Sequence, residues 1–189
     1  MGPVTLDEEN KNFHNDTEII PPKDGTLVKV AGSLGWGLFH RVILCLDINF
    51  SMIGICDSIE TFKNELHPLD TFSRVPLLDD HDFIEFEVMT PNGLMKCLLD
   101  SGFTSNCLNT VQHSDKSLGQ LITNDKYAIK YETFQIGSKD FGPIIFRPIP
   151  LNFPFHIDAI LGREFLADHV VVIDFINREI YIAKSERKD

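Results

Sequence analysis

The segment Cys97–Asn109 (CLLDSGFTSNCLN) contains the residues of this chain that are best suited to catalysis. A short apolar run leads directly into Asp100, and Ser101 and Gly102 follow it. A carboxylate at the end of a buried strand is costly to ionise unless other groups share its charge, and such a carboxylate can serve as a general base. Asp-Ser-Gly triplets are also common in ordinary turns. The residues alone therefore leave both interpretations of Asp100 open.

No other group of side chains has a spacing that indicates a metal or cofactor site. The seven His residues are scattered, without an HExxH pattern or paired spacing. Asp79, Asp80 and Asp82 precede an expected strand, where a solvated turn is the simpler interpretation. We expect neither a metal ion nor a cofactor.

The cysteines are too far apart for a CxxC metal or redox pattern. Four buried thiols are the simplest interpretation, and a disulfide between Cys45 and Cys56 is the alternative in an oxidising compartment. The four positions are Cys45, Cys56, Cys97 and Cys107.

Strand patterns dominate from Val75 onward and must position the candidate turn. FIEFEVMT alternates apolar with acidic residues, and LMKCLLD becomes apolar on both faces near its end. The PNG turn between them predicts a hairpin that ends at Asp100. YAIKYETFQIG predicts a further strand, SKDFG a turn, and PIIFRPIPL another strand. IDAILG predicts an apolar strand, REFLADH a short helix, and VVVIDFINREIYIA a hairpin that turns near Ile176–Asn177.

The first third of the chain has weaker patterns. The sequence predicts a flexible lead-in over residues 1–25 and an extension of uncertain structure over residues 26–73. The apolar stretch Leu38–Cys56 approaches membrane-span length, but a central Asp such as Asp47 costs about 3 kcal/mol in a bilayer. We therefore expect a strand pair or a buried helix there, with a membrane segment as the alternative. Asp57–Leu66 predicts a short helix that begins with a capping box.

The charge balance restricts the partners of the chain. Lys and Arg number 17 against 28 Asp and Glu, a formal net charge of -11. Such a surface repels nucleic acid and anionic lipid, so we expect no nucleic-acid partner. A hydrophobic content of 43% with 15 Phe suits a packed core. The acidic N-terminus is no signal peptide, and periplasmic, secreted and cytoplasmic locations all stay open.

The order of these motifs resembles the retropepsin-like aspartic proteases, the single-copy form of that family. LLDSGFTSNCLN resembles the active-site strand and turn, and IDAILGREFLADHVVVIDFINREIYI resembles the later strand, short helix and closing hairpin. The resemblance covers residues 74–184 and leaves 185–189 as a polar tail. It implies a mainly β fold, a closed β-barrel that forms one half of an acid protease, with one short C-terminal helix and an N-terminal extension.

The resemblance implies an aspartic-type endopeptidase that hydrolyses peptides or proteins without a cofactor. Such enzymes use two carboxylates that share one proton. This chain has one Asp-Ser-Gly triplet, because Asp158 and Asp174 lack a following Ser/Thr-Gly. The second catalytic carboxylate would then be Asp100 of a second copy in a homodimer. The alternative is a retropepsin-fold binding or dimerisation module that has lost catalysis.

The resemblance also implies a role for each matching residue. Asp100 would be catalytic, Ser101 would help to join the two turns of the dimer, and Gly102 would let the backbone approach substrate. The strand that crosses behind the turn, together with the Arg that follows it, would support the site. Those supporting residues are Ile160, Leu161, Gly162 and Arg163.

Three features depart from the family pattern or match it weakly. Phe103 stands where the family has Ala beside the substrate, so it would narrow a pocket, displace the turn, or pack in a differently shaped core. Thr104 stands where retroviral enzymes have the Asp that pairs with the Arg at the position of Arg163. A flap over the substrate would come from residues 112–130, with Gly119 near its tip, although this polar stretch also suits a loop.

Overall fold

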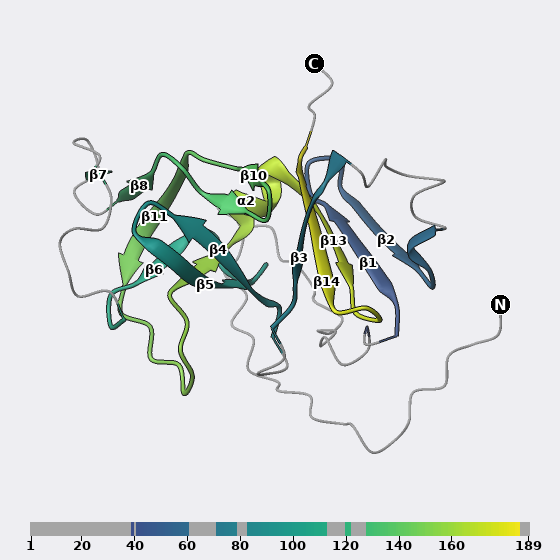
Figure 1. The fold of residues 1–189 in the computed structure, drawn as a ribbon, viewed down its shortest axis with the longest axis horizontal. Coiled ribbons are helices and arrows are strands. Elements are labelled where there is room, and N and C mark those ends of the chain that lie inside the picture. Colours follow the sequence, from purple (N-terminus) through teal and green to yellow (C-terminus); the bar gives the residue numbers. More distant parts are fainter. Residues whose placement is uncertain are drawn as a thin grey trace, which may run out of the picture. The chain divides into compact units, whose positions relative to one another are not determined.

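A computed structural model describes residues 39, 41–60, 71–78, 83–112, 120–121 and 128–185. All of them belong to one compact unit, residues 36–189. Strands dominate these ranges, and the short helix α2 (Arg163–Asp168) comes late in the chain, which confirms the expected fold class (Figure 1).

Five strands form an antiparallel sheet in the order β2-β1-β13-β14-β3. Its strands are β1 (Ile43–Asp47), β2 (Met52–Cys56), β3 (Ser73–Pro76), β13 (His169–Asp174) and β14 (Glu179–Lys184). The central strand β13 is buried at every position, as its continuous VVVI run predicts for a strand covered on both faces. β13 and β14 form the C-terminal hairpin that the sequence pattern predicts.

The hairpin of β1 and β2 shows that the apolar stretch Leu38–Cys56 contains a strand pair. Asp47, the polar residue in its middle, is buried at the end of β1 and accepts a hydrogen bond from the Phe50 N–H in the turn (3.3 Å). β1 also pairs with β13, so two segments far apart in the sequence share one sheet (Figure 1). No helix within the described ranges is long and apolar enough to span a membrane.

Nine strands form the second sheet, in the order β10-β9-β4-β5-β12-β6-β11-β8-β7. They are β4 (Glu85–Thr90), β5 (Gly93–Leu99), β6 (Cys107–Asn109), β7 (Gln120–Leu121), β8 (Ile129–Tyr131), β9 (Gln135–Ile136), β10 (Lys139–Asp140), β11 (Ile144–Ile149) and β12 (Ala159–Leu161). The predicted hairpin before Asp100 is the pair β4–β5. β12 lies between β5, to which it is parallel, and β6, to which it is antiparallel.

One expected strand is divided, which corrects the sequence interpretation. The segment YAIKYETFQIG forms the two strands β8 and β9, and the expected SKDFG turn contains β10. The cause is Asp140, whose Oδ1 accepts hydrogen bonds from the N–H groups of Phe134 and Gly142 (both 2.9 Å) and stabilises a small β9–β10 hairpin. Gly137 turns that hairpin at φ +58, a conformation that favours glycine.

The two faces of β5 pack into different clusters. Cys97 and Leu99 point into the main core, which strands of both sheets share. Leu98 points to the opposite face, into what we call the outer-face cluster. That cluster consists of Leu98, Cys107, Ile157 and Ile160, with Phe103, Ile149, Leu151, Phe153 and Phe155 partly buried against it. The strand before Asp100 is thus held on both faces, and each buried Leu contributes roughly 2 kcal/mol.

Several expectations fall where the structure gives no description. The lead-in at residues 1–25, the acidic positions 79, 80 and 82, and the end of the polar tail lie outside the described residues. Of the helix expected over Asp57–Leu66, Ile59 and Glu60 are helical, and residues 61–66 lie outside the described ranges.

Candidate active site

Asp100 is the first residue after β5, at the point where three strands meet. Its backbone N–H donates to the carbonyl oxygen of Leu161 on β12 (3.1 Å). The chain then passes through a turn, residues 100–106, and continues as β6 on the other side of β12. The turn is therefore attached to adjacent strands at both of its ends.

The Asp100 carboxylate is oriented by the turn that follows it. Its Oδ1 accepts a hydrogen bond from the N–H of Gly102 (2.8 Å), and the Phe103 N–H donates to the Asp100 carbonyl oxygen (3.2 Å). Asp100 is half-buried, whereas Ser101 and Gly102 are exposed. A Cβ atom on Gly102 would lie 3.0 Å from Oδ1, so a larger residue would press on the carboxylate. The carboxylate is thus held in place while remaining accessible.

The start of α2 supports the turn from behind. The N–H groups of Arg163 and Glu164 donate to the carbonyl oxygens of Phe103 (2.8 Å) and Thr104 (3.2 Å). Gly162 lies so close to the turn that a Cβ atom would be 2.5 Å from the Ser105 carbonyl oxygen. Ile160, Leu161, Gly162 and Arg163 thus lie beside the turn, on β12 and at the start of α2.

Asn106 is a structural residue of the site that the sequence did not reveal. Its Oδ1 accepts from the Gly162 N–H (3.1 Å), and its Nδ2 donates to the Ile145 carbonyl oxygen (3.3 Å). Its own N–H donates to Oε2 of Glu164 (3.2 Å). Asn106 therefore joins β12, β11 and α2 at the end of the turn. An Asn among Ser and Thr residues is an ordinary turn signal, so nothing distinguished it in the sequence.

Phe103 packs in the outer-face cluster, which supports one of the three possibilities that the sequence left open. Its ring is half-buried beside Leu98 and Ile160 of that cluster, at the edge of the turn. Thr104 and Arg163 are both exposed. The ion pair recorded at this end of α2 joins Glu164 to Arg147 at 4.0 Å, and its exposure makes its contribution small.

The carboxylates of Asp158 and Asp174 both contact neighbouring groups. Oδ2 of Asp158 accepts from the Lys96 N–H (2.8 Å), and Oδ1 is 2.9 Å from Nε2 of His156. Oδ1 of Asp174 accepts from the N–H groups of Ile176 (3.0 Å) and Asn177 (2.9 Å), two and three residues further on. Within the described ranges, no group of three or more His, Cys, Asp or Glu could hold a metal ion.

Of the expected flap, residues 112, 120–121 and 128–130 are described. β7 pairs with β8 in antiparallel register, Gln120 opposite Lys130, so a short strand pair lies within residues 112–130. Gly119, the expected tip, lies outside the described residues.

All four cysteines are free, and three of them are buried. Cys56 is the half-buried exception. Burial, with smaller contributions from Asp47 and Cys56, raises the pKa of Cys45 to about 12, which keeps this thiol protonated at neutral pH.

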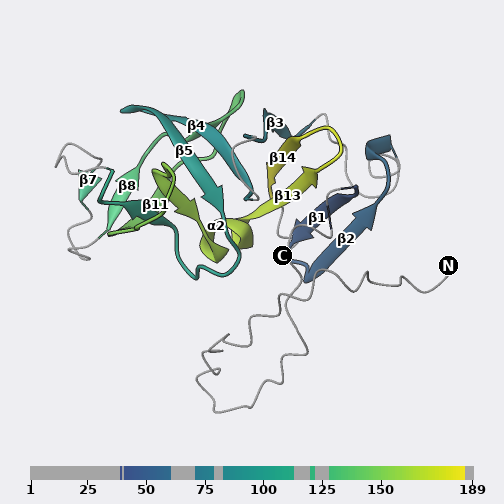
Figure 2. The same ribbon diagram turned by 90° about the horizontal axis from the view of Figure 1, so that it is seen from below.

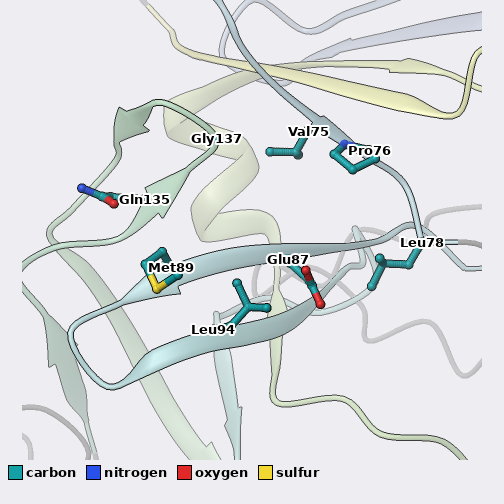
Figure 3. A pocket seen from close by; sticks show the side chains of 8 residues that line it. All are labelled: Val75, Pro76, Leu78, Glu87, Met89, Leu94, Gln135 and Gly137. Atoms are coloured by element: carbon teal, nitrogen blue, oxygen red, sulfur yellow. The ribbon is translucent and has the colours of Figure 1, made fainter.

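A separate pocket lies away from the turn, between β3 and the β4–β5 hairpin (Figure 3). Its volume is about 280 Å³, and Met89 and Leu94 belong to its mainly apolar wall, with Glu87 as its charged residue. No residue of the 100–106 turn lines this pocket.

No family model matches the chain, and no curated protein matches it. Among solved structures, the chain is similar to the crystal structure of a retropepsin-like aspartic protease from Rickettsia conorii, with 18% sequence identity and a TM-score of 0.40. That match covers 61% of this chain and 92% of the other.

Proposed function

We propose that this protein is an aspartic-type endopeptidase that acts as a homodimer, with Asp100 of each copy as the catalytic carboxylate. The observation that carries the proposal is the Asp100 carboxylate itself. It follows a buried strand directly, is oriented by the Gly102 N–H at 2.8 Å, and remains partly open to solvent.

The surroundings of Asp100 favour a reactive role over a purely structural one. The bond from the Gly102 N–H to Oδ1 of Asp100 is the ordinary bond of a turn Asp to the backbone two residues on, so it fixes the side chain in the turn. Asp100 is half-buried, whereas Asp158, which contacts the Lys96 N–H and His156, is buried. The backbone hydrogen bonds from α2 and β12 fix the turn, which pre-organisation for catalysis requires.

Two copies are needed because peptide hydrolysis requires a general base and a general acid together. The ionised Asp100 takes a proton from water, and the water oxygen bonds to the peptide carbonyl carbon. The protonated Asp100 of the partner donates its proton to the carbonyl oxygen, which gives a neutral tetrahedral diol. The first carboxyl then passes its proton to the amide nitrogen. The C–N bond breaks, and a diol hydroxyl returns a proton to the partner as the acid product forms.

Substrate side chains bound next to Asp100 would contact an apolar surface. Phe103 belongs both to the turn and to the outer-face cluster, and it is only half-buried, so part of this residue is accessible near Asp100. We therefore expect peptides with apolar residues beside the cleaved bond to be the preferred substrates.

A second candidate function is a retropepsin-fold binding or dimerisation module without catalysis. Phe103 favours it, since a large ring directly after Gly102 reduces the space beside the carboxylate. In that case Asp100 would serve only the geometry of the turn.

The replacement Asp100→Asn separates the two functions, because Asn keeps the shape of the side chain but cannot act as a base. We expect cleavage of a peptide library between pH 4 and pH 7 to fall by several powers of ten, as the loss of an essential general base implies. Asp57→Asn, at an exposed position after β2, is the matched control and should retain full activity.

Two outcomes would count against the peptidase. Equal cleavage by Asp100→Asn and parent would end the aspartic-protease proposal. No cleavage by either protein, with the Asn variant at least as stable, would favour the binding module instead.

A further inference from the structure

A buried histidine lies at the junction between α2 and β13. His169 caps the C-terminus of α2 and is the first residue of β13, and it is only 4% exposed. Its ring stacks on Phe165 of α2, with ring centroids 4.1 Å apart and planes 17° apart. A second ring, Phe141 from the segment between β10 and β11, lies 5.4 Å away. The imidazole is thus enclosed by aromatic rings.

The hydrogen bonds of this ring define its protonation state. Nδ1 lies 2.6 Å from the carbonyl oxygen of Phe165. A carbonyl oxygen can only accept, so Nδ1 carries the hydrogen and Nε2 of the neutral ring is an acceptor. Nε2 is buried and has no hydrogen-bond partner among the described residues. A second proton on Nε2 would therefore place a charged, unpartnered N–H in an apolar site.

The charged groups around the ring come from several elements. Asp168 on α2 favours a charged ring, and Lys184, which pairs with His169 across β13 and β14, opposes it. Glu164 and Arg147 line the same cavity as His169, and Asp140 lies next to Phe141 in the chain. Desolvation is the largest effect, and it lowers the pKa of His169 from its ordinary value of 6.5.

The same helix connects His169 to the candidate active site. The first residues of α2 donate backbone hydrogen bonds to the turn that carries Asp100, through Arg163 and Glu164. The last turn of α2 is held by the contact of Phe165 with His169. We propose that His169 is a pH-sensitive switch: a second proton would charge a buried ring at the end of α2 and destabilise the fold around the helix that supports the turn of Asp100.

The direction of the effect follows from linkage. Above pH 6.5 the ring is neutral in both folded and unfolded chains, and the full stability is present. As the pH falls below that value, the unfolded chain binds a proton that the folded chain does not. The folding equilibrium constant then drops by about tenfold per pH unit until the folded pKa is reached. If the proposed peptidase works in acid, this loss sets the lower end of its pH range.

The test compares parent and variants by urea unfolding of the full chain from pH 7.5 to pH 4.5. His169→Asn keeps a side-chain N–H near the position of Nδ1 but does not titrate, and His169→Phe keeps the stacked ring. The ratio of variant to parent folding constants should rise by about tenfold per pH unit below pH 6.5, whatever the stability of each variant at pH 7.5. A ratio that is constant with pH would overturn the inference.

His156→Asn is the matched control, since His156 is 58% exposed and its loss should give no such rise.

A second measurement uses the parent alone, in case a variant fails to fold. Among the seven histidine ring signals in its NMR spectrum, one should titrate well below pH 6.5 and show the hydrogen on Nδ1. Titration of all seven near 6.5 would contradict the inference. Neither measurement requires peptide cleavage, so its outcome is independent of the proposed function.

Discussion

At the scale of single residues, the turn around Asp100 depends on two glycines in different ways. At Gly102, an added Cβ atom would meet the carboxylate of Asp100 at 3.0 Å. At Gly162, it would meet the backbone carbonyl oxygens of Ser105 and Phe103 at 2.5 and 2.7 Å. A side chain can move aside, whereas the backbone of the turn is fixed by its hydrogen bonds to the start of α2. A substitution at Gly102 therefore tests the orientation of the carboxylate, and a substitution at Gly162 tests the stability of the fold.

The replacement Gly162→Ala should destabilise the protein strongly, because its new methyl group has no space beside the turn. We expect a loss of about 2–4 kcal/mol in the free energy of unfolding, measured by urea titration at pH 7. Gly102→Ala is the matched variant and should lose less than about 1 kcal/mol while reducing peptide cleavage, since it displaces the Asp100 carboxylate. Equal stability losses in the two variants would contradict this division.

The replacement Phe103→Ala tests the role of that ring. Because Phe103 packs in the outer-face cluster while half-exposed, we expect a loss of about 1–3 kcal/mol in unfolding free energy. Phe50→Ala, in the exposed β1–β2 turn where the ring is 54% exposed, is the control and should cost much less. Unchanged stability combined with raised or broader cleavage would show instead that Phe103 narrows the substrate channel.

At the scale of elements, the sequence predicts local pairs well and distant contacts poorly. The hairpins β4–β5 and β13–β14 follow from alternation and turn residues, and β12 with α2 follows from IDAILG and REFLADH. These are local signals. The pairing of β1 with β13 joins residues more than a hundred positions apart, and no periodicity within either strand reveals its partner.

The elements around the turn show the same limit. The sequence identified Asp100 and the strand with Gly162, but it gave no sign that Asn106 links β12, β11 and α2. It also missed the small β9–β10 hairpin, because the hydrogen bond that stabilises it, from the Phe134 N–H to the Asp140 carboxylate, depends on a side-chain orientation. Residue types indicate which segments form strands. Hydrogen bonds between elements depend instead on which distant segments the fold brings together.

Asn106→Ala should therefore weaken the turn without touching the carboxylate. Its removal leaves the buried Gly162 N–H without its side-chain acceptor, at a cost of about 1–3 kcal/mol. Urea unfolding measures the loss, and amide hydrogen exchange should quicken at Gly162. Asn152→Ala, at an exposed position between β11 and β12, serves as the control. Unaltered exchange at Gly162 would show that Asn106 does not hold the turn.

At the scale of the whole molecule, charge acts against the dimer that the proposed function needs. Each copy carries a formal net charge of -11, so two copies repel each other. Salt screens this repulsion and shortens its range. Association must then rest on contacts strong enough to overcome this repulsion.

Raising the ionic strength from 20 to 200 mM should tighten the dimer, with a dissociation constant lower by roughly threefold or more. Sedimentation at several protein concentrations measures it, and activity per chain should rise over the same concentration range. A monomer at every concentration, with full activity, would refute the two-chain mechanism.

The most direct test of the central claim mixes parent with Asp100→Asn at a constant total concentration, after unfolding and refolding the two together. If each active unit needs Asp100 from both copies, activity falls as the square of the parent fraction, to about one quarter in an equal mixture. If each chain acts by itself with its own Asp100, activity falls in proportion and stays at about one half. The two-carboxylate account predicts one quarter, and a value of one half would contradict it.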